Sequence, residues 1–210
     1  MDNEFTHFEN DVLREIGNIG AGNATTSMAK LMNQEVAMEV PYVQLLTIND
    51  MVNIVGGPEE VLVTTFFKVE GDITGTVYFL LSVEEATMIA RQLLQDTTIK
   101  ISATEHIDEM VLSVLKEVAN IVVGAYISAL ADFSNINIST TVPFISIDMA
   151  AATLVTGLIE LSHASDHSIL IGTKFSGDEA TENAQGHFLL VPDLDSIPTL
   201  FTALGVDKDG

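Results

Sequence analysis

Two twelve-residue stretches of the sequence are variants of one another. The first is Asp11-Val-Leu-Arg-Glu-Ile-Gly-Asn-Ile-Gly-Ala-Gly22, and the second is Ser113-Val-Leu-Lys-Glu-Val-Ala-Asn-Ile-Val-Val-Gly124. Six of the twelve positions are identical, whereas ordinary amino-acid usage gives roughly one identity in fifteen positions. The offset of 102 residues continues to a proline in each copy, Pro41 and Pro143. The sequence therefore predicts one domain, residues 1–210, made of two repeats at about 1–100 and 101–210.

The duplicated stretch has the spacing of an amphipathic helix. Apolar residues recur at intervals of three and four, which predicts helices over residues 8–33 and 104–133, the second capped by Thr104. Asp11, Glu15 and Asn18 stand at i, i+4 and i+7, so they share one stripe of the helix, and Gly22 continues it. The opposite, inward side is predicted to carry the apolar residues Val12, Leu13, Ile16 and Ile19.

The remaining segments are predicted to form strands, turns and two short helices. Strands are expected at 36–46 and 136–147, each interrupted by its proline, and at 61–69, 73–81, 153–162, 168–175 and 187–191, with turns at 70–72 and 165–167. Helices are expected at 84–94, capped by Ser82, and at 197–204, and connectors at 49–58 and 176–185. The fold class predicted is α/β: internally duplicated and pseudo-twofold, with helices layered on a largely antiparallel sheet.

Composition narrows the classes of partner. The chain carries 30 acidic residues against 8 Lys and Arg, a formal net charge of −22, which disfavours nucleic acid and anionic membranes and favours a basic protein surface. Adaptation for solubility or high salt is the alternative reading of this charge. The start of the chain lacks a signal-peptide pattern, and no apolar run approaches the length needed to cross a bilayer. We therefore expect a cytoplasmic protein without membrane insertion.

The polar stripe is predicted to be a contact surface. Exposed glutamates are ordinary, so a solvated helix face is the alternative for either copy alone. Yet Glu and Asn are retained in both copies, although Asn is a poor residue within a helix and Gly costs about 1 kcal/mol there relative to Ala. Open access for a partner is the interpretation we favour for Gly22 and Gly124, with helix packing as the alternative. Gly17 and Gly20 occur in the first copy alone, which favours local packing for them.

The pattern Asp/Ser-x3-Glu-x2-Asn-x22-Pro, present twice, resembles the CheC family of chemotaxis phosphatases, related to CheX and FliY. The resemblance covers nearly the whole chain, and two motifs in one chain argue against CheX, which resembles a single-motif dimer. One departure is Ala119, where the family usually has Gly. We expect the alanine to be tolerated, because Ala is the better helix former.

The resemblance implies hydrolysis of the aspartyl phosphate on the response regulator CheY. Catalytic roles fall on two pairs: Asn18 and Asn120 would orient the attacking water, as a Gln does in small GTPases, and Glu15 and Glu117 would dock the regulator. The positions implied to support them are Asp11, Ser113, Gly22, Gly124, Pro41 and Pro143. No cofactor of its own is implied, because the regulator supplies Mg²⁺.

A second implied partner is CheD, a receptor deamidase, with Asp148 in the segment that resembles its binding surface. The alternative function is a non-catalytic adaptor that docks on CheD or on the regulator. No metal site is expected. The five histidines are scattered, and the chain has no Cys.

Overall fold

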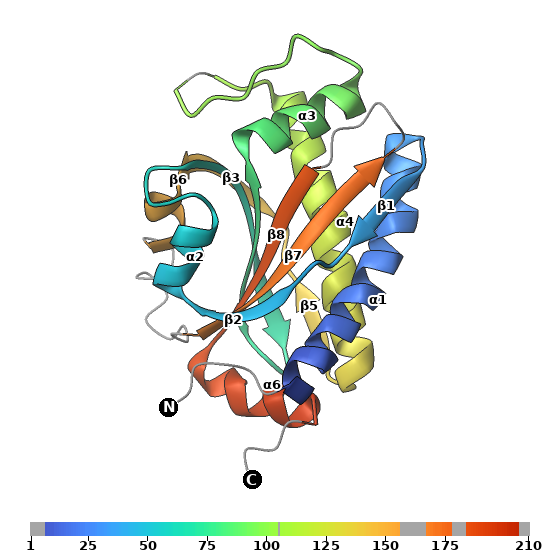
Figure 1. Ribbon diagram of the computed structural model, residues 1–210, viewed down its shortest axis with the longest axis vertical. Helices are drawn as coiled ribbons and strands as arrows, with labels where there is room; N and C mark the ends of the chain where they lie inside the picture. Colours follow the sequence, from blue (N-terminus) through green and yellow to red (C-terminus); the bar gives the residue numbers. More distant parts are fainter. Residues whose placement is uncertain (1–6, 105, 156–166, 178–183, 206–210) are drawn as a thin grey trace.

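The computed structural model describes residues 7–104, 106–155, 167–177 and 184–205 (Figure 1). Both long helices predicted from the duplication are present, α1 at His7–Met32 and α4 at Glu109–Ser134. The predicted cap at Thr104 is wrong, because Asp108 caps α4 by accepting a hydrogen bond from the Met110 amide at 2.7 Å. Thr104 instead donates its amide to the Ser102 hydroxyl, in a turn that precedes the helix.

Eight strands form one sheet in which every recorded pairing is antiparallel, as the sequence predicted. The order is β1-β7-β8-β4-β3-β5, with β2 also paired to β7 and β6 also paired to β3. The strands are β1 Val36–Glu39, β2 Val43–Thr47, β3 Val61–Gly71, β4 Gly75–Ser82, β5 Ile138–Thr140, β6 Phe144–Met149, β7 His167–Gly177 and β8 Ala184–Pro192.

The two repeats exchange strands within this sheet. From the first repeat, β1 and β2 pair with β7 of the second. From the second repeat, β5 and β6 pair with β3 of the first. The hairpins β3–β4 and β7–β8 meet in the middle, where β4 pairs with β8. Neither repeat completes its own sheet, so the two repeats are interlaced in one folded unit.

The helices α1 and α4 run antiparallel on one face of the sheet (Figure 1). They cross where Gly20 of α1 meets Tyr126 of α4, and a side chain at Gly20 would collide with the tyrosine ring. Gly17 likewise lies against Val40, whose Cγ1 is 3.2 Å from the place of an added Cβ. The packing role predicted for both glycines is confirmed. The core between these helices and the sheet holds most of the buried apolar residues.

The opposite face of the sheet is covered by the short helix α2, Ile48–Ile54, and by a π-helical turn at Ala151–Val155 (Figure 1). The connector predicted at 49–58 is therefore wrong in part. Thr47 and Asp50 form a capping box that starts α2, with the Thr47 hydroxyl and the Asp50 carboxylate each bonding the other residue's backbone amide. A second, smaller core holds Met51, Val52, Tyr78, Leu80, Leu154, Leu170, Leu189 and Val191.

The strand predicted at 153–162 is wrong at its start, because residues 151–155 are π-helical. The rest of that strand and residues 165–166 of the predicted turn lie outside the described residues. The connector predicted at 176–185 is shorter than expected, since β7 continues to Gly177 and β8 begins at Ala184.

The other short helices were predicted. Helix α3, Val83–Leu94, is capped by Ser82 in a capping box with Glu85. The chain continues after β8 through a 3-10 turn, Leu194–Ser196, into α6 at Ile197–Ala203.

We expected no segment long and apolar enough to cross a bilayer, and helix α4 shows that this expectation was wrong. The helix passes that test by length and composition: it has 26 residues, and an 18-residue window within it has a mean hydropathy of 1.6. In this fold α4 is a core helix, and Val118, Ala119, Val122 and Val123 are fully buried. The core helix of a soluble protein passes the same test.

Candidate functional site

The polar stripe of α1 faces outward. Asp11, Glu15, Asn18 and Gly22 are all exposed. The inward side of the helix is made by apolar residues such as Leu13 and Ile16, which are almost completely buried. Because the stripe repeats at i, i+4, i+7 and i+11, burial of one helix face presents these four positions together.

The second copy has the same arrangement on α4. Ser113, Glu117 and Asn120 are exposed and Gly124 is half-buried. Leu115 and the residues that follow it on the same face lie in the core. The fold therefore brings one predicted Glu/Asn pair to the surface on each of the two long helices.

The Glu and Asn side chains have no partners within the described part of the chain. Glu15, Asn18, Glu117 and Asn120 make no hydrogen bond or ion pair there. Asn is a poor helix former, and neither Asn side chain makes a hydrogen bond within the described part of the fold that would offset this cost. Both pairs are thus available to a partner or to water.

The two copies differ one turn before the Glu. In the first copy, Asp11 accepts a hydrogen bond from Arg14 at 2.7 Å, and this ion pair is exposed on both sides. In the second copy the corresponding residues are Ser113 and Lys116, which are not paired. An exposed i, i+3 pair contributes little stability, so the main effect at the first copy is to offset the Asp11 charge.

Gly22 and Gly124 border open space. A Cβ atom added at either glycine would meet no atom within 4 Å. The alternative for these two positions was helix packing. No other described element packs on either glycine, whereas Gly17 and Gly20 are in close contact with other residues. An open backbone beside Asn18 or Asn120 gives another molecule close access to the amide.

Ile19 corrects the sequence prediction. It was assigned to the inward side of α1, but it is exposed. At 100° per residue Ile19 lies only 40° around the helix from Glu15, so it belongs beside the polar stripe. The helical spacing already places Ile19 near Glu15, so its assignment to the inward side was wrong on the sequence itself.

Pro41 and Pro143 each lie in a bulge of the sheet. Between β1 and β2, residues 40–42 oppose only residues 172–173 of β7. Between β5 and β6, residues 141–143 oppose only residues 67–68 of β3. Proline suits this position because it has no amide to pair, and an extra residue bends the strand. Pro41 follows Val40, which packs on Gly17 beside Asn18, so the bulge lies next to the polar stripe.

Comparison with known proteins matches this arrangement. A model of the CheC-like family matches the chain twice, at residues 8–44 and 110–147, which are the two helices with their proline links. CheY-P phosphatase CheC of Bacillus subtilis (strain 168) is 36% identical over 195 residues, 93% of each chain. The chain belongs to the CheC-like family.

Solved structures agree on the fold. Thermotoga maritima FliY matches with a TM-score of 0.73 at 18% identity, covering 96% of this chain and 98% of that one. The FliM middle domain from H. pylori matches with a TM-score of 0.63 at 14% identity, covering 95% and 99% of the two chains. These identities are low, so the two structures bear on the fold alone, and they confirm its α/β class.

Asp148 lies apart from both Glu/Asn sites in the chain. It is an exposed residue of β6, and its Oδ1 accepts a hydrogen bond from the Met149 amide at 2.8 Å. Met149 and Phe144 of the same strand are also exposed. An edge strand with a carboxylate and apolar side chains is a surface that another protein can contact.

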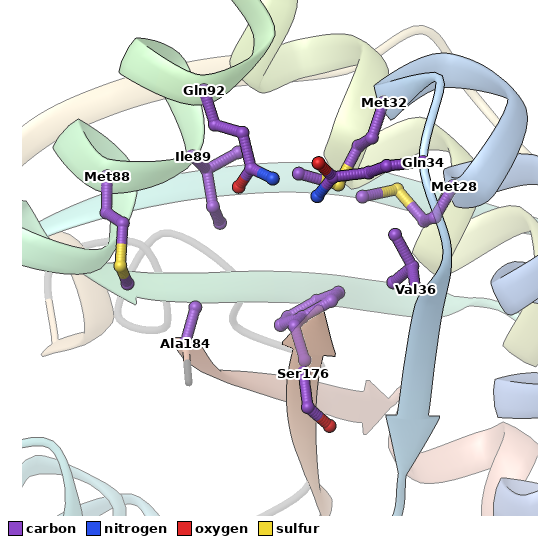
Figure 2. A pocket seen from close by; sticks show the side chains of 10 residues that line it. Met28, Met32, Gln34, Val36, Met88, Ile89, Gln92, Ser176 and Ala184 are labelled. Carbon is purple, nitrogen blue, oxygen red and sulfur yellow. The ribbon is translucent and has the colours of Figure 1, made fainter. Parts of the chain in front are cut away.

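A pocket that the sequence did not predict lies at the C-terminal end of α1, beside α3 (Figure 2). Its space of about 360 Å³ includes open solvent. The amides of Gln34 and Gln92 point toward one another across it, and the Gln34 Nε2 is buried without a partner among the described residues. None of the predicted site residues lines the pocket.

Tyr42 and His187 form a polar pair on the face of the sheet opposite α1. The Tyr42 hydroxyl lies 3.0 Å from His187 Nδ1, and burial lowers the pKa of the His187 imidazole while the Glu85 carboxylate opposes that shift. The histidine is therefore favoured in its neutral form, in which Nδ1 can accept from the tyrosine. Among the described residues no group of three or more His, Asp or Glu side chains could hold a metal ion.

Proposed function

We propose that this chain hydrolyses the aspartyl phosphate of a CheY-type response regulator. The observation that carries the proposal is the exposure of the same partner-free Glu/Asn pair on both α1 and α4. The 36% identical relative from Bacillus subtilis is a CheY-P phosphatase. The reaction needs an exposed amide to orient water and an exposed carboxylate to bind the regulator, and this chain presents both on each long helix.

The proposed chemistry places a water molecule and needs no ionisable catalyst. The amide oxygen of Asn18 or Asn120 accepts a hydrogen bond from a water and aims its lone pair at phosphorus. Attack in line breaks the bond between phosphorus and the aspartyl oxygen, which releases inorganic phosphate and restores the regulator's carboxylate. An acyl phosphate is already activated, so positioning supplies most of the acceleration.

The Glu residues are proposed to dock the regulator. Glu15 stands three residues before Asn18, and Glu117 three residues before Asn120, so each carboxylate lies about one helical turn from the amide it assists. Both are exposed and unpaired, which suits charge pairing with a lysine at the regulator's phosphorylation site. The regulator is proposed to bring its own Mg²⁺, which neutralises the phosphoryl oxygens.

Loss of regulator phosphate tests this function directly. A regulator labelled on its aspartate with radioactive phosphate is mixed with the chain at one tenth of its concentration, and the remaining label is followed in time. Faster loss with multiple turnovers supports the proposal. An unchanged decay, with the chain shown to bind the phosphorylated regulator, would replace hydrolysis with the adaptor function.

The adaptor function has its own observation, the exposed Asp148 with Met149 and Phe144 on β6. We propose CheD as the partner for this strand, in the cytoplasm. Titration calorimetry checks it: Asp148→Lys should weaken CheD binding while regulator dephosphorylation stays unchanged. Equal CheD affinity for the variant and the wild type would remove Asp148 from that interface.

A further inference from the structure

The two Glu/Asn sites differ in their exposed apolar side chains. Ile19 at the first site has a relative exposure of 41%, whereas its counterpart Ile121 is half-buried and packs against the main core. The residue before the proline differs in the opposite sense, because it is more exposed in the second copy. Val142 is 87% exposed there, whereas its counterpart Val40 is 9% exposed.

The two copies differ by one methyl group at the helix position where Val40 packs. Val40 packs on α1 at Gly17, with its Cγ1 3.2 Å from the place of an added Cβ, closer than ordinary van der Waals contact. On α4 the position of Gly17 is taken by Ala119, which is completely buried and carries that Cβ. The methyl group of Ala119 leaves less room for a valine at this position than Gly17 does, and Val142 is 87% exposed.

Ile19 is continuous with the first site. It follows Asn18 directly, lies one helical turn after Glu15, and stands three residues before the open backbone of Gly22. Residues three and four apart are neighbours on a helix surface. A molecule that reaches Asn18 over Gly22 therefore contacts the Ile19 side chain.

Val142 is held at the second site by a fixed backbone. The preceding Thr141 donates its amide to the Lys68 carbonyl at 3.0 Å, and its hydroxyl accepts from the Lys68 amide at 3.0 Å. Val142 then precedes Pro143 in the bulge that corresponds to the one beside Asn18. The internal repeat relates Val142 to Val40, which packs on Gly17, the residue before Asn18. From this relation we infer that Val142 borders the second site.

We propose that the regulator is anchored by Ile19 at the first site and by Val142 at the second. The inference rests on the proposed function, since the regulator is the molecule that must reach Asn18 and Asn120. Burial of an exposed apolar side chain in an interface favours binding in proportion to the area covered. The two sites thus dock the same regulator through different apolar contacts.

A crossed set of variants tests the proposal. Asn120→Ala leaves the first site alone active, and Asn18→Ala leaves the second. In the Asn120→Ala chain, Ile19→Ser should raise the half-saturating regulator concentration about tenfold, or about 1.4 kcal/mol, with turnover unchanged, and Val142→Ser should change neither value. In the Asn18→Ala chain, the effects of these two substitutions should be reversed.

A matched control is Ile54→Ser, since Ile54 is 37% exposed on α2, on the opposite face of the sheet (Figure 1). It should leave both kinetic values unchanged in both chains. The proposal is overturned if Ile19→Ser and Val142→Ser act equally in the two chains, act on turnover alone, or have no effect. It is also overturned if neither single-site chain is active although the wild type is. A wild type that does not accelerate phosphate loss would refute the proposed function itself.

Discussion

At the scale of single residues, Glu15 and Glu117 are assigned to docking. Reversing both charges, Glu15→Lys with Glu117→Lys, should raise the half-saturating regulator concentration at least tenfold, because a pairing contact becomes a repulsion. Turnover at saturation should change little, since these carboxylates transfer no proton. Saturation kinetics measure both values, and a fall in turnover at constant half-saturation would contradict the docking role.

Gly22 and Gly124 are assigned to access. In Gly22→Gln with Gly124→Gln, activity should be lost because the new side chains occupy the path to the amides. Stability should stay level or rise by several tenths of a kcal/mol at each site, since Gln is the better helix former and the space there is open. Regulator decay and denaturant unfolding measure the two effects.

Gly20 provides the matched control for that pair. Gly20→Ala should lower the free energy of unfolding by about 1–3 kcal/mol through overpacking, since its Cβ would meet the Tyr126 ring. A folded double Gln variant with full activity would refute the access role.

Elements of the fold were predictable where the signal was local. The periodicity of residues 8–33 and 104–133 predicted both long helices, and Ser82 predicted the start of α3. Helix α2 was missed because its signal is one capping box within an expected connector. The exchange of strands could not be predicted, since two similar repeats allow pairing within or between them with the same local pattern.

Some features of the candidate site could be predicted from helical spacing, and others depend on tertiary packing. Exposure of Asn18 and Asn120 followed from the helical spacing of the duplicated stretch. The same spacing places Ile19 near Glu15, although it was assigned to the inward side. Exposure of Val142 did not follow from spacing, because it depends on what packs against that segment. In the first copy the corresponding contact is a tertiary one, between Val40 and the position held by Gly17.

The capping box gives a prediction for α2 as an element. Replacing Thr47 by Val removes the hydroxyl that accepts from the Asp50 amide, and should lower the free energy of unfolding by about 1 kcal/mol. Activity should be unchanged, because α2 lies on the face opposite α1 and α4 (Figure 1). Denaturant unfolding measures the loss. Wild-type stability in Thr47→Val would mean that the cap contributes nothing.

For the whole molecule, the strand exchange gives each site parts from both repeats. The bulge at Pro41 is paired to β7, and the bulge at Pro143 is paired to β3. Each polar helix is therefore supported by strands from the other half of the chain. Both sites depend on the complete fold, whichever one meets the regulator.

Stability of the whole fold should depend on the charge of His187. Its pKa in the folded state is lowered by burial, so the unfolded chain binds the proton more readily, and stability is lost as the pH falls below the unfolded value of about 6.5. The free energy of unfolding is measured from pH 8 to 5. The advantage of the wild type over His187→Asn should shrink below pH 6.5, and a constant difference would contradict the assignment.

Asn18 and Asn120 are proposed to position the attacking water, and removing both amides tests this role most directly. Asn18→Ala with Asn120→Ala should slow stimulated loss of regulator phosphate about 10²-fold or more, while each single variant stays active through its other site. The fold should be retained, because neither amide bonds within the described chain. A double variant that dephosphorylates the regulator at the wild-type rate would contradict the account.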